Sequence, residues 1–261
     1  MGVSITISNH KGGVGKTCTA VNLGHALARE NKKVLVVDFD LQLNCTRNLY
    51  GKDRPIHSLT ELLDPREAPI TDIKNFVYPT EHQNLFVVPN TKQSAAIERL
   101  LFLDPERLKT FRLRFRDYIN NRFDYALFDT PPNYGGFTMS AMLASDCVIV
   151  PCETGSKDSM EGVNEAVKFI ESIRDDFNLD VIFLKVLLTK RDRRVLIHKA
   201  TVEQIKDNYP SEKRFETIIP ANTHLQQAEM FGTTVFRLRS NATGAIAYEQ
   251  AAKELIETIE G

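Results

Sequence analysis

Residues 9–17 read NHKGGVGKT and follow directly on the apolar run Val3 to Ser8. Beyond them, apolar residues at helical spacing run from Ala20 to Leu27. A glycine-rich turn between a strand and a helix lets successive backbone N–H groups face inward, and the helix N-terminus adds partial positive charge. In such a turn, Lys16 reaches the β- and γ-phosphates and Thr17 offers a hydroxyl to Mg²⁺. The stretch therefore predicts a phosphate-binding loop.

Two positions of this loop are unusual. The general pattern GxxxxGK[ST] has glycine where this chain has His10. Lys11 is a second lysine at the start of the loop. Its side chain is either a solvated loop charge or a cation delivered to a phosphate, including a phosphate of a neighbouring subunit.

The rest of the chain alternates short apolar runs with segments of helical spacing. The candidate strands are Val3 to Ser8, Val34 to Asp38, Leu85 to Pro89, Tyr125 to Asp129, Cys147 to Pro151, Val181 to Thr189 and Phe215 to Pro220. The candidate helices are Thr17 to Asn31, Ser94 to Leu103, Pro105 to Asn121, Met160 to Arg174, Val195 to Asn208 and Gly244 to Ile259. The run VLVVD is apolar up to its terminal acid, whereas a strand with one wet face alternates, so helices should cover both faces of the sheet. We predict an α/β fold with a doubly wound, mostly parallel sheet in a single domain over residues 1–261, with residues 51–82 the least regular part.

Length and composition bound the class of protein. The 261 residues, 42% hydrophobic and 26% charged, indicate a globular chain and exclude collagen-like, coiled-coil and largely disordered proteins. Lys and Arg number 33 and Asp and Glu 34, so the net charge is −1 and any attraction to nucleic acid must come from a local patch. The stretch MGVSITISNHKGG has no basic region followed by a long apolar run, so we expect no signal peptide. No run of about 18 apolar residues and no CxxC pair among the four cysteines occurs in the sequence. We expect a cytoplasmic protein with reduced thiols.

The predicted helix Pro105 to Asn121 has one apolar stripe and one basic face. The basic face carries Arg107, Lys109, Arg112, Arg114 and Arg116. Because a run of charges is usually a solvated face, we expect exposed surface here rather than a nucleic-acid site.

Three acidic residues lie at the ends of predicted strands: Asp38 and Asp40 after one strand, and Asp129 after another. In an open α/β sheet, ligands bind beyond the carboxyl ends of the strands. A carboxylate there holds Mg²⁺ through its waters or positions the attacking water of a phosphoryl transfer. Asp38 has a second interpretation, as a strand-ending cap.

Several stretches resemble the deviant Walker A ATPases of the ParA/Soj/MinD family. The loop motif KGGVGKT, the sequence DFDLQ at residues 38–42 and the sequence FDTPP at residues 128–132 carry the resemblance. It extends to LFVVPNTKQSAAIERLL, to DCVIVPCETG followed by Gly162, to Ile219-Pro220 and to AYEQAAKEL, and so covers essentially the whole chain. The resemblance implies a deviant Walker P-loop NTPase fold and an ATP hydrolase of weak intrinsic activity that uses ATP and Mg²⁺.

The resemblance also implies residue roles. Lys11 would be the signature lysine that crosses a nucleotide-sandwich dimer to the ATP of the other subunit. Lys16 and Asp40 would complete the catalytic set, with Asp40 orienting the water. Asp129 would be the Walker B acid beside Mg²⁺, and Asp38 would support the metal shell.

The implied nucleotide and metal sets are larger. The nucleotide set comprises Lys11, Gly12, Gly13, Val14, Gly15, Lys16, Thr17, Cys18, Asp129, Lys190, Pro220 and Ala221, and the metal set comprises Thr17, Asp38 and Asp129. Two residues depart from the family pattern: Leu41 replaces the proline of DxDPQ, and Cys18 stands where threonine is common. These departures bear on loop stiffness and hydrolysis rate.

Basic residues near the C-terminal third offer a DNA surface. By resemblance the DNA-binding residues would be Arg194, Lys199, Arg237 and Arg239, the first lying in the run KRDRR at residues 190–194. The alternative is a solvated loop, and His224 stands where the family has another arginine. The acidic segment 249–260 would be repelled by anionic lipid, so we expect no membrane binding. Only Met1 to Ser8 precede the loop, so we expect no N-terminal helix-turn-helix domain.

These observations favour a DNA-partition ATPase. ATP would build a homodimer that binds double-stranded DNA without sequence preference on the nucleoid, and a ParB-like centromere-binding protein on the cargo would stimulate hydrolysis. Two alternatives stay open: an ATPase of the same group that positions another cargo, such as a protein compartment or a chemosensory array, or a nucleotide-binding scaffold with little turnover.

Overall fold

The computed structural model describes residues 2–64, 66, 72–192 and 194–261. Its centre is a seven-stranded sheet with the order β3-β4-β2-β5-β1-β6-β7, parallel except for the pairing of β3 with β4. The strands are β1 (Val3–Ile7), β2 (Val34–Asp38), β3 (Tyr78–Pro79), β4 (Leu85–Val88), β5 (Tyr125–Asp129), β6 (Cys147–Glu153) and β7 (Ile182–Thr189). All five residues of β2 and of β5 are buried, as expected for strands covered on both faces.

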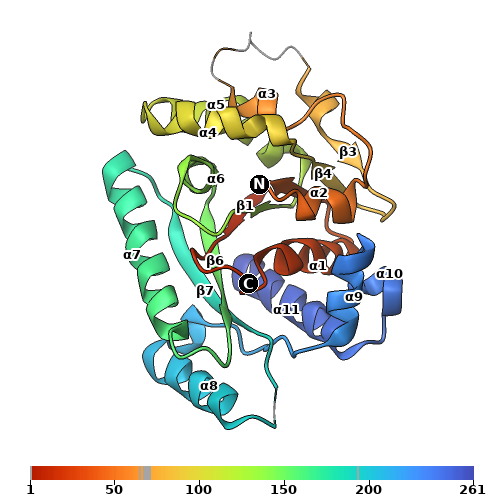
Figure 1. Cartoon of the computed structure of the whole chain (residues 1–261), viewed down its shortest axis with the longest axis vertical. Coiled ribbons are helices and arrows are strands. Elements are labelled where there is room, and N and C mark those ends of the chain that lie inside the picture. Colours follow the sequence, from red (N-terminus) through yellow and green to blue (C-terminus); the bar gives the residue numbers. More distant parts are fainter. Residues whose placement is uncertain (1, 65, 67–71, 193) are drawn as a thin grey trace.

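Helices cover both faces of this sheet (Figure 1). One apolar cluster packs α1 (Lys16–Arg29), α2 (Asn44–Leu49), α9 (Thr223–Phe231), α10 (Val235–Arg239) and α11 (Thr243–Glu260) on one face. A second cluster packs α3 (Leu59–Leu63), α4 (Ala95–Phe102), α5 (Thr110–Arg122), α6 (Gly136–Ala144), α7 (Ser159–Phe177) and α8 (Leu196–Asn208) on the other. Four short 3-10 helices are η1 (Ile73–Phe76), η2 (Lys92–Ser94), η3 (Arg107–Lys109) and η4 (Ser211–Lys213). The doubly wound α/β fold predicted from the sequence is confirmed.

The register of the central strands brings two acids together. Ile7 at the end of β1 lies opposite Asp129 at the end of β5, and Asp129 lies opposite Asp38 at the end of β2. The loop that begins at Asn9 therefore opens at the same edge of the sheet as both carboxylates. This edge is where a doubly wound sheet places its ligand.

The predicted strand Phe215 to Pro220 is wrong. The backbone of this segment bonds to β7 at its two ends, where the N–H of Phe215 donates to Val186 O and the N–H of Ile219 donates to Leu188 O, both at 2.9 Å. Between these points, the backbone N–H groups of residues 216 and 217 donate instead to the Glu254 carboxylate of α11, at 2.8 and 3.1 Å. A side chain distant in the sequence thus accepts the N–H groups that a β-ladder with β7 would use.

Other elements were missed. Helices α2, α3, α6, α9 and α10 and the two-residue strand β3 have no counterpart among the predicted elements. Most of these helices are too short to show a helical period. α6 is buried on nearly every side, so its sequence has no amphipathic pattern. In the region of residues 51–82, expected to be irregular, α3, η1 and β3 form, while residues 65 and 67–71 lie outside the described part of the chain.

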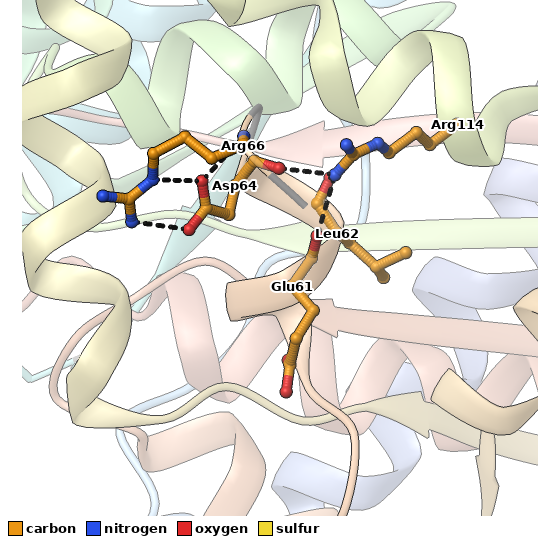
Figure 2. Close-up of polar contacts among 5 residues, drawn as sticks. All are labelled: Glu61, Leu62, Asp64, Arg66 and Arg114. Carbon is orange, nitrogen blue, oxygen red and sulfur yellow. Dashed lines mark hydrogen bonds and ion pairs between the residues drawn. The ribbon is translucent and has the colours of Figure 1, made fainter. Parts of the chain in front are cut away.

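The predicted basic face is only in part the solvated surface that we expected. Arg107 and Lys109 lie in η3, where they form partly exposed ion pairs with Asp104 and Glu106. Arg112, Arg114 and Arg116 of α5 instead bind neighbouring elements. Arg112 donates to Leu143 O at 2.7 Å, and Arg116 binds Asp146, so both hold the end of α6 and the turn after it. Arg114 donates to Glu61 O at 2.8 Å and to Asp64 O at 2.7 Å at the end of α3 (Figure 2). The last carbonyls of a helix have no partner within the helix, and a cation there also opposes the negative end of the dipole. These arginines therefore serve packing between helices.

Among the described residues, no helix is both long enough and apolar enough to span a membrane. α11, which ends the chain, buries seven residues on the face that packs on α1.

Candidate nucleotide-binding site

The loop between β1 and α1 depends on two glycines with left-handed backbone. Gly13 has φ of 75° and Gly15 has φ of 90°, a region that disfavours side chains. Gly15 is the N-cap of α1, and its carbonyl accepts from the N–H of Thr19 at 2.8 Å. Thr189 Oγ1, at the end of β7, donates to Val14 O at 2.9 Å and ties the loop to the sheet. The loop is therefore held in shape before any ligand arrives.

Lys16 is buried within this loop. Its side chain is 7% exposed, and its ammonium donates to Lys11 O at 2.9 Å. Burial lowers the pKa of Lys16, whereas the nearby carboxylates of Asp129 and Asp40 raise it. A cation so desolvated is strongly attracted to an anion that enters the loop.

Asp129 is a buried carboxyl without a partner. It is fully buried, and neither of its carboxylate oxygens has a hydrogen-bond partner among the described residues. Burial first, and then the neighbouring Asp38, raise the pKa of Asp129 well above its usual range, while Thr17 and Lys16 lie near enough to oppose this shift. Unpaired carboxylate oxygens beside a threonine hydroxyl fit Mg²⁺, a hard cation that takes oxygen ligands and supplies the missing charge.

Asp38 is engaged with its own turn. Its Oδ2 accepts from the N–H of Thr46 at 2.8 Å and from Thr46 Oγ1 at 2.6 Å, and its Oδ1 accepts from the N–H of Asp40 at 3.0 Å. Burial raises the pKa of Asp38 to about 6 against these hydrogen bonds. Both oxygens are thus in use, which favours the strand-ending cap over a direct place in the metal shell. Asp40, held by the N–H of Gln42 at 2.9 Å, lines the cavity described next.

A cavity of about 380 Å³ opens over the loop. Of the residues in the predicted site, Gly12, Gly13, Gly15, Lys16, Thr17, Cys18, Asp40, Lys190, Pro220 and Ala221 line it. Lys11, Val14, Asp38 and Asp129 are near the loop but are not part of the lining. The volume lies within the range of small-molecule sites, about 300–1,000 Å³.

Part of the cavity wall was not predicted. Asn44, Pro132, Thr189, Ile219, Asn222, Leu225, Gln226, Glu229 and Tyr248 also line it. Asn222 caps α9 by accepting from the N–H groups of His224 and Leu225 at 3.0 and 3.2 Å. The Asn-Thr pair after Pro220 is an N-cap signal that could have placed α9 beside the cavity.

Cys18 faces this wall as a neutral thiol. Tyr248 OH donates to its sulfur at 3.6 Å, and Asn22 Nδ2 lies 3.5 Å from the sulfur. Burial raises the pKa of Cys18 to about 11, so the thiol stays protonated near neutral pH. All four cysteines are free, as we expected.

Lys11 lies against its own chain. Its ammonium contacts Asp158 O at the start of α7, and its side chain packs against Gly162 in the first turns of that helix. In this conformation, Lys11 is directed to α7 and not to the cavity.

The four residues of the expected DNA surface fall into two groups. Arg194 and Lys199 are exposed at the start of α8, and Arg194 pairs with Asp192 at 2.9 Å. Arg237, paired with Glu81, and Arg239 lie on α10. Figure 1 shows α8 and α10 far apart in the fold, so the two groups do not form one continuous surface on a single subunit.

Two further residues bear on the expected DNA surface. His224 Nε2 lies 3.4 Å from Arg239, so this histidine belongs to the α10 group. Arg193, in the same basic run, lies outside the described residues.

Comparison with known proteins gives consistent results. A family model described as "AAA domain" matches residues 2–183. The sporulation initiation inhibitor protein Soj of Bacillus subtilis is 34% identical over 256 residues, 98% of this chain and 98% of that protein. The chromosome partitioning protein ParA of Caulobacter vibrioides is 33% identical over 260 residues, 97% of this chain and 93% of that protein. A crystal structure of cobyrinic acid a,c-diamide synthase from Mycobacterium smegmatis, with a bound ATP analogue and magnesium, has the same fold, with a TM-score of 0.82 at 24% identity over 100% of this chain and 97% of that one.

Proposed function

The chain belongs to the ParA/MinD superfamily of P-loop ATPases, and from that premise we propose that it is a DNA-partition ATPase whose ATP-bound homodimer binds DNA. The observation that carries the proposal is the cavity that unites the glycine loop, Lys16 and Asp40 at the carboxyl edge of the sheet. Relatives that are named for chromosome partitioning support the proposal that the cargo is DNA. We assign both the ATPase activity and the proposed DNA binding to one domain over residues 1–261.

The residues of the cavity suit phosphoryl transfer to water. Backbone N–H groups of the loop and the Lys16 ammonium bind the triphosphate and stabilise the charge that develops on it. Mg²⁺, held by Thr17 and Asp129, neutralises phosphate charge when it is bound. Asp40 orients the attacking water, because its carboxylate lines the cavity while the N–H of Gln42 fixes its orientation. Lys190, Pro220 and Ala221 lie on the cavity wall, where they would contact the nucleotide base.

The dimer follows from Lys11. In the single subunit its ammonium is held by a carbonyl of α7, and a triphosphate of the partner subunit would offer it a stronger, charge-assisted partner. ATP binding and dimer formation are then coupled through this one side chain.

DNA binding follows from the two basic groups. Arg194, just before α8, Lys199 on α8, and Arg237 and Arg239 on α10 are exposed. A dimer doubles both groups on one particle. Contacts of this kind reach phosphates, so binding should be independent of sequence and fall steeply with salt. A ParB-like protein on the cargo would stimulate hydrolysis and release the dimer from the nucleoid.

The test uses random-sequence duplex DNA and the full chain. With ATP and Mg²⁺ at low salt, wild type should retard the duplex and run as a dimer in size-exclusion chromatography. Lys16→Ala should lose nucleotide binding and both properties, whereas Lys11→Ala should bind nucleotide and stay a monomer. ATP-loaded wild type that retards no duplex at any salt concentration would overturn the DNA assignment.

A further inference from the structure

A second cavity lies beside α2, next to the ATP pocket but separate from it. Its volume is about 360 Å³, and its walls come from α2, from the segment after it and from the segment that follows β4. Asn44 lines the ATP pocket, and the neighbouring Leu43 and Thr46 line the second cavity, so α2 separates the two.

The wall of this cavity is strongly cationic. It contains Arg47, Lys52, Arg54 and Lys92, all exposed, and one acid, Asp53. Within the described part of the chain, none of these four cations forms an ion pair, although sixteen ion pairs occur elsewhere in it. In a protein with a net charge of −1, four such cations around one hollow leave a local positive field that attracts an anion.

A buried donor on the same wall is also without a partner. Asn90, two residues after β4, is 1% exposed and lines the cavity. Its Oδ1 accepts from the N–H of Thr91 at 2.8 Å, but among the described residues its Nδ2 has no hydrogen-bond partner. A buried amide donor left unpaired is destabilising, so its retention calls for a ligand or a function.

Asn90 is joined to the catalytic turn by hydrogen bonds. The N–H of Asn90 donates to Thr46 Oγ1 at 2.9 Å, and Thr46 Oγ1 donates to Asp38 Oδ2 at 2.6 Å. The other oxygen of Asp38 accepts from the N–H of Asp40 at 3.0 Å. A displacement of Asn90 or Thr46 would therefore be transmitted through these hydrogen bonds to the backbone of Asp40.

We propose that this second cavity is a binding site for a phosphate group, distinct from the ATP pocket, and that its occupant acts on the Asp38–Asp40 turn through Thr46. Lys52, Arg54 and Lys92 supply the charge, and Asn90 is the oriented donor at the base. The phosphate belongs either to a small phosphorylated molecule, which the volume suits, or to a nucleic-acid backbone.

The experiment follows backbone and side-chain amide signals of the full chain by NMR, with the ATP pocket saturated by Mg²⁺ and a non-hydrolysable ATP analogue. Saturation is checked beforehand by calorimetry, so a failure to bind nucleotide is seen separately from a failure of the second site. Inorganic phosphate is the probe in one arm and a short random-sequence duplex in the other. We expect saturable shifts at residues 52, 54 and 90, with the amides of Thr46 and Asp40 shifting at the same midpoint.

The double variant Lys52→Ala/Arg54→Ala should weaken phosphate binding at least tenfold. The matched control is Arg122→Ala/Lys168→Ala, which removes two other exposed cations that, in the described structure, have no ion pair. It should bind like wild type. A duplex that displaces the phosphate would assign the site to a nucleic-acid backbone, and a duplex that leaves it bound would assign it to a small ligand. No saturable shift in either arm, or equal binding by the Lys52/Arg54 variant, would overturn the site, and silent Thr46 and Asp40 amides would overturn its link to the turn.

Discussion

The side chain of Lys11 packs against the bare Cα of Gly162, so closely that a methyl group at position 162 would lie 3.0 Å from both Lys11 Cδ and Cε. The carbonyl that Lys11 contacts, Asp158 O, also accepts the N–H of Gly162 at 3.1 Å. Gly162 thus provides the space in which Lys11 rests on its own subunit. A lysine that must reach another subunit has to leave this space first.

Replacing this glycine should therefore release Lys11. Gly162→Ala places a methyl group against the flexible stem of Lys11, which can yield without disturbing the helix. The intramolecular contact then competes less with the partner's phosphate, and the dimer should form at several-fold lower protein concentration in the presence of a non-hydrolysable ATP analogue. Sedimentation velocity measures this midpoint.

The control for helix propensity is Ser172→Ala, which favours the same helix without touching Lys11. A Gly162→Ala variant with the wild-type midpoint would show that the resting contact does not restrain Lys11. The double variant Lys11→Ala/Gly162→Ala should remain monomeric.

Asp40 can be tested without disturbing its turn. Asp40→Asn keeps an oxygen that can accept the N–H of Gln42, the 2.9 Å bond of the native turn. It loses the negative charge that, in our proposal, orients the attacking water. Phosphate release should fall by about a hundredfold, while the affinity for ATP changes little. Turnover is measured by phosphate release and affinity by calorimetry. Equal turnover of Asp40→Ala, Asp40→Asn and wild type would refute the role of this carboxylate.

The phosphate loop was predictable because its chemistry is local. Two glycines with positive φ, a lysine and a threonine between a strand and a helix lie within a few residues of one another, so the pattern and the geometry coincide. Asp129 was predictable for a related reason, since the carboxyl ends of parallel strands meet at one edge. The meeting of Asp129 with Asp38 follows directly from the register of β5 and β2.

What escaped prediction depends on contacts between distant segments. The Glu254 carboxylate takes two N–H groups of the expected strand at residues 215–220, and no local pattern reveals this. The cavity wall formed by α9 contains Gln226 and Glu229, residue types that are common on any solvated helix. Arg112 and Arg116 of α5 donate to carbonyls at the end of α6, a helix without a sequence signal. Resting positions, such as that of Lys11 on α7, are equally non-local.

Arg114 should contribute to stability and not to DNA binding. Its guanidinium donates to carbonyls at the end of α3 (Figure 2), which are the groups that a helix leaves without a partner. Arg114→Met keeps most of the apolar stem and removes these donors, so the free energy of unfolding should fall by about 1–3 kcal/mol. Urea unfolding measures the loss. Arg122→Met, an exposed position on the same helix, is the control and should change little; equal stability of the two variants would contradict the role of Arg114.

A pair of stacked histidines should make the fold sensitive to acid. The rings of His25 and His82 stack at 3.9 Å, and His25 Nδ1 lies 2.8 Å from Thr234 Oγ1. Burial, and then the nearby His82 and Arg29, lower the pKa of His25 to about 3; burial also lowers the pKa of His82. In the unfolded chain the pKa of a histidine is about 6.5.

The sign of the effect follows from proton counts. Between pH 6.5 and pH 3, His25 is protonated in the unfolded chain but stays neutral in the folded chain. The contribution of His25 to the free energy of unfolding is therefore fully present above pH 6.5 and is lost as the pH decreases. One such group contributes a slope of about 1.4 kcal/mol per pH unit, or about 2 kcal/mol between pH 6.5 and pH 5. Urea unfolding of wild type and His25→Gln at pH 5 and pH 7.5 measures the difference between the two slopes. The variant, which lacks the His25 imidazole, should lose about 2 kcal/mol less than wild type on acidification. Parallel slopes would show that His25 is not a source of acid sensitivity.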